Sequence, residues 1–486
     1  MPPEAETANY LMESIKRSLL PLLAWWRPGG QTRRGVGSRI LSGTLALGLV
    51  SCLAKIFAMG RDTLVAKTLG VGDSMDAFAV ALGLGTFAIS LLMSSLNYAL
   101  VPTLVGVRES DGRAGAQRLL SNALAIGLPV LLVVGVINAF AADTMIHILA
   151  PAFDPKKLAL TSFLLCTLLP GIVASGFGST CAAVLNSEKR FVLVGLVPAF
   201  TPFLAMVLLL APGLTDPTNG VTRLAGATCM GLLCEAALVA LLMRRLGYSL
   251  MPKWSGLDAA TRTVFVQMSY RCLAALLMSA MALVEQATAA RLGPGNVAML
   301  SYSNKVLSAL LGIAGVSLLT VTLPHFAELI AAGDWVAVRR TIRRYTWLII
   351  LGTLPLVAFL GFFSEPVVRL LFERGSFTHS ATLMVSSMQS LYALQVPFYI
   401  LGSFYSAVLL SLNANAAMLI GNLLNLVLCG GLNFFFARRF GLAGVACASV
   451  LVYSSGTLFL RLALMHRIKK ASLPPASREA LIVRGP

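Results

Sequence analysis

The sequence predicts an all-α integral membrane protein with about 12 transmembrane helices in two six-helix lobes. Three observations support this fold class. Of the 486 residues, 57% are hydrophobic and 12% are charged, whereas a typical soluble domain is ~45–50% apolar and ~25% charged. Apolar runs of roughly 20 residues, long enough to cross ~30 Å of hydrocarbon, recur along the chain. Segments of the first half also return in the second half at offsets of 218 to 224 residues.

The apolar runs place the expected helices in order along the chain. They cover 40–60, 78–105, 119–141, 158–185, 191–211, 221–243, 265–290, 298–323, 345–363, 381–411, 416–436 and 441–465.

Three pairs of similar segments indicate an internal repeat of six helices. They are 66-AKTLGVG-72 with 290-ARLGPG-295, 178-GSTCAAVL-185 with 402-GSFYSAVL-409, and 224-LAGATC-229 with 442-LAGVAC-447. Six is an even number, so both copies enter the membrane in the same orientation, as in transporters built from parallel repeats. The predicted parts are a basic tail (1–39), an N-lobe (40–246), a linker (247–264), a C-lobe (265–466) and a second tail (467–486).

The distribution of basic residues predicts the orientation in the membrane. Of the 38 Lys and Arg residues, 24 lie on the face that carries both termini and ten on the other. Because basic residues are retained on the cytoplasmic side, both termini are expected in the cytoplasm. The protein is expected to be a multi-pass protein of the cell inner membrane. The apolar stretch 19-LLPLLAWW-26 lacks a cleavage site and predicts an interfacial helix. With this distribution, the net charge of +18 does not indicate nucleic-acid binding.

The sequence offers no site for an enzyme or a cofactor. All eight cysteines lie in predicted helices, outside any CxxC pair, and the four histidines are scattered over loops and helix ends. The chain has no phosphate-binding P-loop, metal-spaced cluster or GxSxG motif. We therefore expect no cofactor, no metal and no disulfide, and a transporter driven by an ion gradient or the membrane potential.

Charged residues inside predicted helices are the candidate functional residues, because a charge at mid-membrane costs ~2.5–3.5 kcal/mol unless it faces a cavity or partner. Lys55 lies about a turn and a half from the exported end of the first helix, so it either reaches the interface or faces a cavity. The other candidates inside predicted helices are Arg271, Glu285, Lys305 and the polar Asn304, and those at the ends of the first two predicted helices are Arg61, Asp62 and Asp76. A cavity with net positive charge favours an anionic group, and phosphate is the obvious candidate.

Four segments resemble the MurJ/MviN family of lipid II flippases, which belongs to the MOP exporter superfamily. They are 54-AKIFAMGRDTLVAKTLGVGDSMDAF-78 with 100-LVP-102, then 301-SYSNKVLSALLGIAGVSLLTVTLPHFAELIAAGD-334, 372-FERGSFT-378 and 441-GLAGVACASVLVY-453. The resemblance covers most of residues 40–467 and implies a MATE/MurJ-like fold. It places the cationic residues of the family's substrate cavity on Lys55, Arg61 and Lys305, beside Asn304. The remaining candidates, Asp62, Asp76, Arg271 and Glu285, are expected to act in gating or ion coupling.

The resemblance implies a flippase that moves an undecaprenyl-diphosphate-linked saccharide from the inner to the outer leaflet. Two departures favour an exopolysaccharide or other surface-glycan precursor over lipid II. The family's arginine pair in the second helix is absent, because 77-AFAVALGLGTFAISLLMSSLNYALVPTLVGV-107 carries no charge. The chain also stops soon after the twelfth helix, where lipid II flippases add two more. The expected partners are the lipid-linked glycan, the bilayer and glycan-synthesis enzymes.

Three other functions are weighed against this one. An ion-coupled drug exporter of the same superfamily would carry cations and need an acidic cavity. A glycan polymerase or ligase would need a long exported loop, and the longest here is about 17 residues. A non-transporting subunit of a glycan-synthesis complex would tolerate neutralisation of Lys55 and Lys305.

Overall fold

A computed structural model describes residues 36–188, 190–210, 217–412 and 414–471. The chain divides into two compact units, Met1–Leu47 and Gly48–Pro486. The described residues of the first unit form the first turns of helix α2 (Val36–Leu69). The predicted interfacial helix at 19–26 and the C-terminal residues from 472 onward lie outside the described residues. The packing described below belongs to the second unit.

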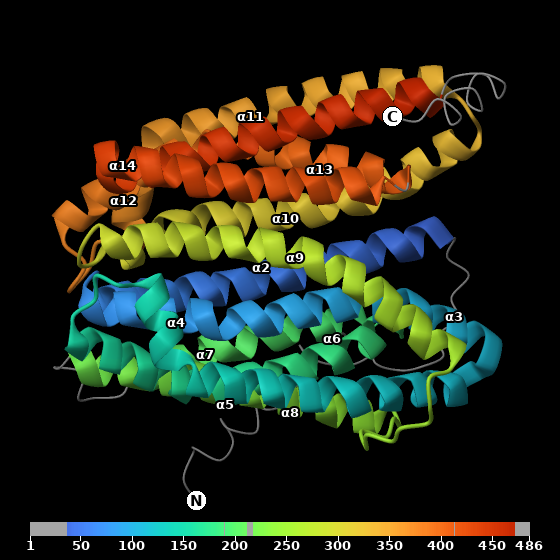
Figure 1. Ribbon diagram of the computed structural model, residues 1–486, viewed down its shortest axis with the longest axis horizontal. Coiled ribbons are helices and arrows are strands. Elements are labelled where there is room, and N and C mark those ends of the chain that lie inside the picture. The colour runs from blue at the N-terminus through green and yellow to red at the C-terminus, as the bar shows by residue number, and fades with distance from the viewer. Residues whose placement is uncertain (1–35, 189, 211–216, 413, 472–486) are drawn as a thin grey trace, which may run out of the picture. The chain divides into compact units, whose positions relative to one another are not determined.

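The described residues confirm the all-helical fold, and no strand occurs among them (Figure 1). After α2, the helices are α3 (Asp73–Phe140), α4 (Ala142–Leu149), α5 (Pro155–Ser187), α6 (Phe191–Leu196), the 3₁₀ helix η1 (Val197–Ala199), α7 (Phe200–Leu209), α8 (Pro217–Arg245), α9 (Ala259–Arg291), α10 (Asn296–Ala331), α11 (Trp335–Phe372), α12 (His379–Ala393), α13 (Val396–Ser411) and α14 (Asn415–Ala471).

Breaks within long helices reconcile these elements with the predicted spans. Within the described residues, six helices are long and apolar enough to cross a membrane, and the pair α12–α13, bent by 41°, makes a seventh. However, α3 has 68 residues and would be about 100 Å long, far more than one crossing needs. It breaks at Gly112 (φ 65°), and α14 breaks at Gly441 (φ 57°). Helices α3 and α14 therefore count as two segments each. The other eight segments are α2, α5, the run α6–α7, α8, α9, α10, α11 and the pair α12–α13, which gives the twelve predicted segments.

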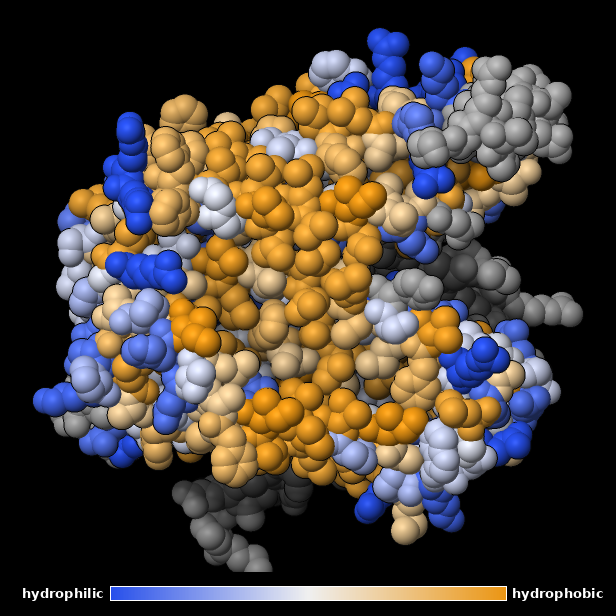
Figure 2. Space-filling view, viewed as in Figure 1, coloured by the Kyte–Doolittle hydropathy of each residue, from blue (hydrophilic) through white to orange (hydrophobic). Residues whose placement is uncertain are grey.

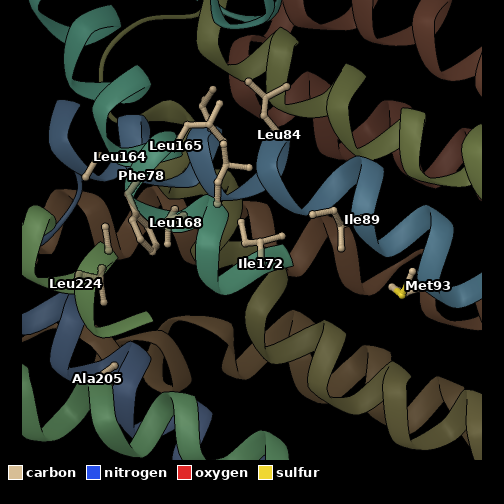
Figure 3. Packing of buried hydrophobic residues seen from close by; sticks show 14 of the residues in the cluster. Phe78, Leu84, Ile89, Met93, Leu164, Leu165, Leu168, Ile172, Ala205 and Leu224 are labelled. Atoms are coloured by element: carbon tan, nitrogen blue, oxygen red, sulfur yellow. The ribbon is translucent and has the colours of Figure 1, made fainter. Parts of the chain in front are cut away.

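The N-terminal half of the second unit is built around α3, α5 and α8, which pack side by side. One face of α5 carries buried leucines that meet apolar residues of its neighbours (Figure 3). The residues labelled there are Leu164, Leu165, Leu168 and Ile172 of α5, Phe78, Leu84, Ile89 and Met93 of α3, Ala205 of α7 and Leu224 of α8. Gly171 lets α5 approach α8 closely, because a Cβ there would stand 2.7 Å from the backbone oxygen of Cys229.

The C-terminal half has its own apolar clusters. In the largest, Val338 and Ile342 from the start of α11 pack with Leu464 and Ile468 from the end of α14, around Phe404 of α13. The start of α11 and the end of α14 therefore share one apolar cluster through α13, which packs against both helices.

Helix α9 belongs to both halves. It packs against α3 and also against α14, and Figure 1 shows it beside α10 at one end and α3 at the other. Near its start, Val264 is buried in the cluster formed mainly by α3 and α5. Near its end, Met281 is buried with Cys429 and Val452 of α14. Each end of α9 is thus fixed to a different half.

Side-chain amides of α3 hold the segment between α8 and α9, Leu246–Asp258. We call this segment the linker from here on, in place of the predicted range 247–264. Gln117 donates to the Ser249 carbonyl (2.8 Å) and accepts from the Ser249 N–H (2.9 Å). Asn122 accepts from the Ser255 N–H (2.8 Å) and donates to the Thr261 hydroxyl (3.0 Å). These amides replace backbone partners that the irregular linker lacks. The predicted boundary between the lobes, in this region, stays a prediction.

A tyrosine provides a further attachment of the linker. The Tyr248 hydroxyl donates to Glu188 (2.6 Å), and Glu188 also pairs with Arg108 (2.9 Å). Burial, together with this hydrogen bond to a carboxylate, raises the pKa of Tyr248 to about 12. Tyr248 therefore remains a neutral donor at physiological pH.

The outer surface is apolar, as expected of a protein surrounded by lipid. Large exposed hydrophobic side chains occur on many helices, and Phe140 and Phe362 are 89% and 84% exposed. Figure 2 shows a broad band of hydrophobic side chains on one face, with hydrophilic side chains gathered at its borders. Soluble proteins rarely expose apolar patches of this extent. The chain is a multi-pass membrane protein.

Candidate functional site

Three charged residues from the two halves form an ion cluster between α2 and α10. Asp62 accepts from Arg61 Nη2 (2.7 Å) and from Lys305 Nζ (2.6 Å), both at Oδ1. Asp62 is buried, whereas the Arg61 and Lys305 side chains are 24% and 23% exposed. The Lys305 ammonium also lies 5.4 Å from the ring centre of Tyr302. The cluster carries a net charge of +1 and unites three of the sequence-predicted residues.

Two other predicted substrate-binding residues lie on the same helices. Lys55 is on α2, six residues before Arg61, and its side chain is exposed. Within the described part of the chain, no hydrogen bond or ion pair of Lys55 is found. Asn304, next to Lys305, donates to the Leu300 carbonyl at 3.4 Å. The structure therefore joins Lys305 to Asp62 and leaves Lys55 available to another anion.

Asp76 lies in a separate site, where the two halves meet. Its side chain is 0% exposed and accepts hydrogen bonds from the N–H groups of Gly295 (2.6 Å) and Ala298 (2.8 Å). These amides open α10, so a carboxylate of α3 caps a helix of the other half. The N-terminus of a helix is electropositive and binds anions. We use the name junction for this contact together with two others described below, the ion pairs of Lys157 and the hydrogen bonds of Ser376 to the end of α2.

Lys157, at the start of α5, neutralises Asp76. Its ammonium donates to Asp76 Oδ2 (2.8 Å) and to Asp73 Oδ1 (2.6 Å), and it lies 4.0 Å from the ring centre of Phe153. A buried carboxylate needs such a cation because an isolated buried charge is very costly. Sequence reasoning counted Lys157 as an ordinary loop charge. The one feature of the nearby sequence that marks Lys157 is its position at the start of a helix, where Asp154 accepts from the Lys157 N–H.

A second junction contact joins the end of α2 to the turn between α11 and α12. The Ser376 N–H donates to the Lys67 carbonyl (2.9 Å), and the Ser376 hydroxyl donates to the Thr68 carbonyl (3.1 Å). Two glycines permit this approach. Gly70 (φ +62°) and Gly375 (φ +59°) have left-handed backbones, and a Cβ on either would clash with a facing backbone carbonyl. Both glycines are visible in the sequence, but the contact between the two segments that carry them could not be predicted from it.

Glu285 lies in a third group, within the C-terminal half. Its carboxylate accepts from the Ser449 hydroxyl of α14 (2.6 Å). Cys429, also of α14, is buried near Met281, one turn of α9 earlier. Arg271, also predicted as a gating or coupling residue, is exposed near the middle of α9. The predicted gating residues Asp62, Asp76 and Glu285 thus lie in three groups. Sequence reasoning had placed them around one cavity.

The cluster offers cations from both halves, and the junction offers a charged contact that separation of the halves must break. No group of three or more His, Cys, Asp or Glu side chains that could hold a metal ion occurs in the described part of the chain. The groups present can bind an anion and move protons or cations. They contain no nucleophile paired with a base.

Curated proteins of similar sequence are flippases by name. A "probable lipid II flippase MurJ" of Rhizobium meliloti is 26% identical over 355 residues, or 72% of this chain and 66% of the relative. One from Synechocystis is 27% identical over 446 residues, covering 87% of this chain and 80% of the relative. The chain therefore spans just under two thirds of the Rhizobium relative.

Solved structures show the same fold. A lipid II flippase MurJ in an inward closed conformation superposes with a TM-score of 0.70 at 18% identity, covering 88% of this chain and 90% of that chain. An inward-facing multidrug MATE transporter of the MOP superfamily gives 0.73 at 16% identity, covering 87% and 98%. At such identities the likeness concerns the fold. The family model "Lipid II flippase MurJ" matches residues 65–478, including Asp76, Glu285 and Lys305, so the chain belongs to the MurJ lipid II flippase family.

Proposed function

We propose that this protein is an alternating-access flippase that moves an undecaprenyl-diphosphate-linked saccharide from the inner to the outer leaflet of the bacterial cytoplasmic membrane. The observation that carries the proposal is the ion cluster of Arg61, Asp62 and Lys305, built from both halves within membrane helices. Family membership supports the same activity. The protein acts as a transporter and catalyses no reaction of its own.

The ion cluster suits a diphosphate. Arg61 presents planar paired donors and Lys305 a compact ammonium, the two groups that proteins use most often for phosphate. In the structure, Asp62 pairs with both cations. A diphosphate would take over these donors, and exposed Lys55 would add a third cation on the same helix, with Asn304 beside Lys305. Binding of the diphosphate would then release Asp62 from its ion pairs with Arg61 and Lys305.

The junction is the exported gate in this proposal. The ten basic residues of the exported face include Lys67, Lys157, Arg291 and Arg374, all near the junction. Both termini would then be cytoplasmic, as the bias of basic residues predicts. A closed junction corresponds to the inward-facing state. Asp76 would control opening, because its bonds to α10 must break when the halves separate.

Glu285 is the proposed coupling group. A carboxylate within membrane helices is costly unless it exchanges a proton or binds a cation. Among the described residues, its hydrogen-bond partner is the Ser449 hydroxyl, so a proton or a monovalent cation can still approach the carboxylate. Arg271, on the same helix, would respond to movement of α9. Coupling through Glu285 explains how a chain without a P-loop drives transport.

Two classes of saccharide compete as cargo. The family name favours lipid II. The uncharged stretch 77–107 of α3 favours an exopolysaccharide or other surface-glycan precursor, because the site then holds fewer cations than the family pattern provides. A depletion strain separates them: arrested murein synthesis and lysis indicate lipid II, whereas loss of surface glycan in growing cells indicates the other precursor. Glycan-synthesis enzymes would supply either cargo.

Substitution of the cations tests the proposal. Lys55→Ala and Lys305→Ala should each reduce delivery of lipid-linked glycan to the outer leaflet at least tenfold, because one charged hydrogen bond contributes about 1.5–3 kcal/mol. Lys253→Ala is the control, since Lys253 is an exposed lysine of the linker that belongs to neither the ion cluster nor the junction. Unchanged delivery in both variants, at normal protein levels, would contradict the model and favour a non-transporting subunit. Export of cationic drugs by the parent protein would instead favour the drug-exporter alternative.

A further inference from the structure

Four arginines crowd the first turns of α11. Arg339, Arg340, Arg343 and Arg344 are all exposed, at spacings of i, i+1, i+4 and i+5. Arg339 faces Arg343 along the helix and Arg340 faces Arg344, and like charges at i, i+4 repel. The positive end of the helix dipole also lies nearby. The fold itself gains nothing from this arrangement.

Most of these arginines are not used by the protein. Within the described part of the chain, no carboxylate lies within ion-pair distance of Arg340, Arg343 or Arg344. Elsewhere, Arg108 pairs with Glu188 and Arg369 with Glu365, at 2.9 Å and 2.7 Å. Each unpaired guanidinium presents five donors to the surroundings. Water or an external anion must satisfy them.

The end of α14 carries a further exposed arginine, Arg467. Its neighbours Leu464 and Ile468 belong to the same apolar cluster as Val338 and Ile342 of α11. The acidic residues nearby are Glu328 near the end of α10 and Asp334, which is engaged as the cap of α11 through the Ala337 N–H (2.8 Å). We call Arg340, Arg343, Arg344 and Arg467 the arginine platform. Its charge is strongly positive.

The apolar neighbours of the platform show what it faces. On α11, Val336 before the arginines and Trp347 after them are 69% and 56% exposed, and Leu348 and Leu351 beyond are exposed as well. Tryptophan concentrates at the level of lipid headgroups. Arginines followed by a tryptophan and exposed leucines are the order expected where a helix enters the hydrocarbon.

We infer that the arginine platform binds the phosphate groups of anionic phospholipids in the cytoplasmic leaflet. Guanidinium groups grip phosphate through paired hydrogen bonds, and basic residues next to a membrane helix attract anionic lipid. The location in the cytoplasmic leaflet rests on the proposed orientation. The platform anchors α11 and α14, and so holds the C-terminal half against the bilayer while the other half moves.

The test measures which lipids surround Trp347. The full chain, with its other tryptophans replaced by Phe, is reconstituted with dibrominated phosphatidylglycerol or dibrominated phosphatidylcholine, and quenching by the two lipids is compared. Each basic residue near an anionic surface strengthens attraction roughly fivefold. The parent protein should therefore favour phosphatidylglycerol at least threefold. Arg340→Gln with Arg343→Gln and Arg344→Gln should reduce the ratio to near one, and high salt should weaken it.

The matched control replaces three exposed arginines of the other half, Arg244, Arg245 and Arg262, by Gln. They lie at the same end of the membrane helices, so a general effect of positive charge would lower the ratio equally in both triple variants. That result, or an unchanged ratio in the platform variant, overturns the inference. Lys305→Ala should keep the parent ratio. Failure of the platform is thereby distinguished from failure of the proposed transport function.

Discussion

Substitution of Asp76 by Asn should open the junction. The change is nearly isosteric but removes the charge that faces the first amides of α10, Gly295 and Ala298. It does not strand the buried cation, because Lys157 keeps Asp73 as a partner at 2.6 Å. The direct effect of the substitution therefore falls on the contact between the halves.

The size of the effect follows from the bonds that are lost. Hydrogen bonds to a charged group contribute about 1.5–3 kcal/mol each. Asn keeps one neutral acceptor oxygen, so the closed junction loses one charged bond and weakens the other, in total about 2–3 kcal/mol. At 1.4 kcal/mol for each factor of ten, the open state should become roughly 30- to 150-fold more populated.

The assay follows the accessibility of a cysteine placed at Val297, which is 1% exposed at the start of α10. In a chain whose eight cysteines are replaced, a membrane-impermeant maleimide added from outside should label Val297→Cys only in the open state. Asp76→Asn should raise the labelling rate 30-fold or more. Asp73→Asn is the control, because Asp73 pairs with Lys157 without touching α10. Equal rates in the two variants would refute the assignment of the junction to Asp76.

Three further predictions concern other contacts. Gly70→Ala should raise the same labelling rate at least tenfold, because its φ of +62° and a clash with the facing carbonyl disfavour closure, whereas Gly72→Ala, with nothing within 4 Å, should leave the rate unchanged. Glu285→Gln should abolish the dependence of flipping on an imposed pH or sodium gradient in proteoliposomes; a variant that keeps this dependence places coupling elsewhere. Tyr248 has its pKa raised from 10.0 to about 12, so its stabilisation is complete below pH 10 and is lost as the pH rises toward 12. The difference in unfolding temperature between the parent and Tyr248→Phe should shrink over that interval, and a constant difference would contradict the hydrogen-bond role.

Hydropathy and small residues made most of the fold predictable. Apolar runs found the membrane segments because lipid demands long helices whose backbone groups are all paired internally. Breaks were harder to predict. The run 381–411 reads as one helix, but the chain bends by 41° between α12 and α13, where Pro397 lacks the N–H that would continue the helix.

The candidate site was predictable in kind but not in arrangement. Lys305 was identified as a charge inside a predicted helix, because an ionised group there is costly without a role. Arg61 and Asp62 lie just past the end of the first predicted helix, and the family resemblance drew attention to Arg61. Asp76 reaches Gly295 across 219 residues, and no local pattern encodes such a contact. Lys157 escaped notice for a related reason: its importance comes from two carboxylates of another helix.

The two attachments of α9 make it a mechanical element. Its first turns are tied to α3 through Asn122 and Thr261, and its last turns to α14 through Glu285 and Ser449. A rod of 33 residues clamped to two bodies must flex when they turn, and the strain gathers where side-chain packing is thinnest. That stretch is the middle of α9, where Arg271, Leu273, Leu276 and Met278 are exposed. Bending of α9 in this stretch would change the position of Glu285, which lies about two turns further along the same helix.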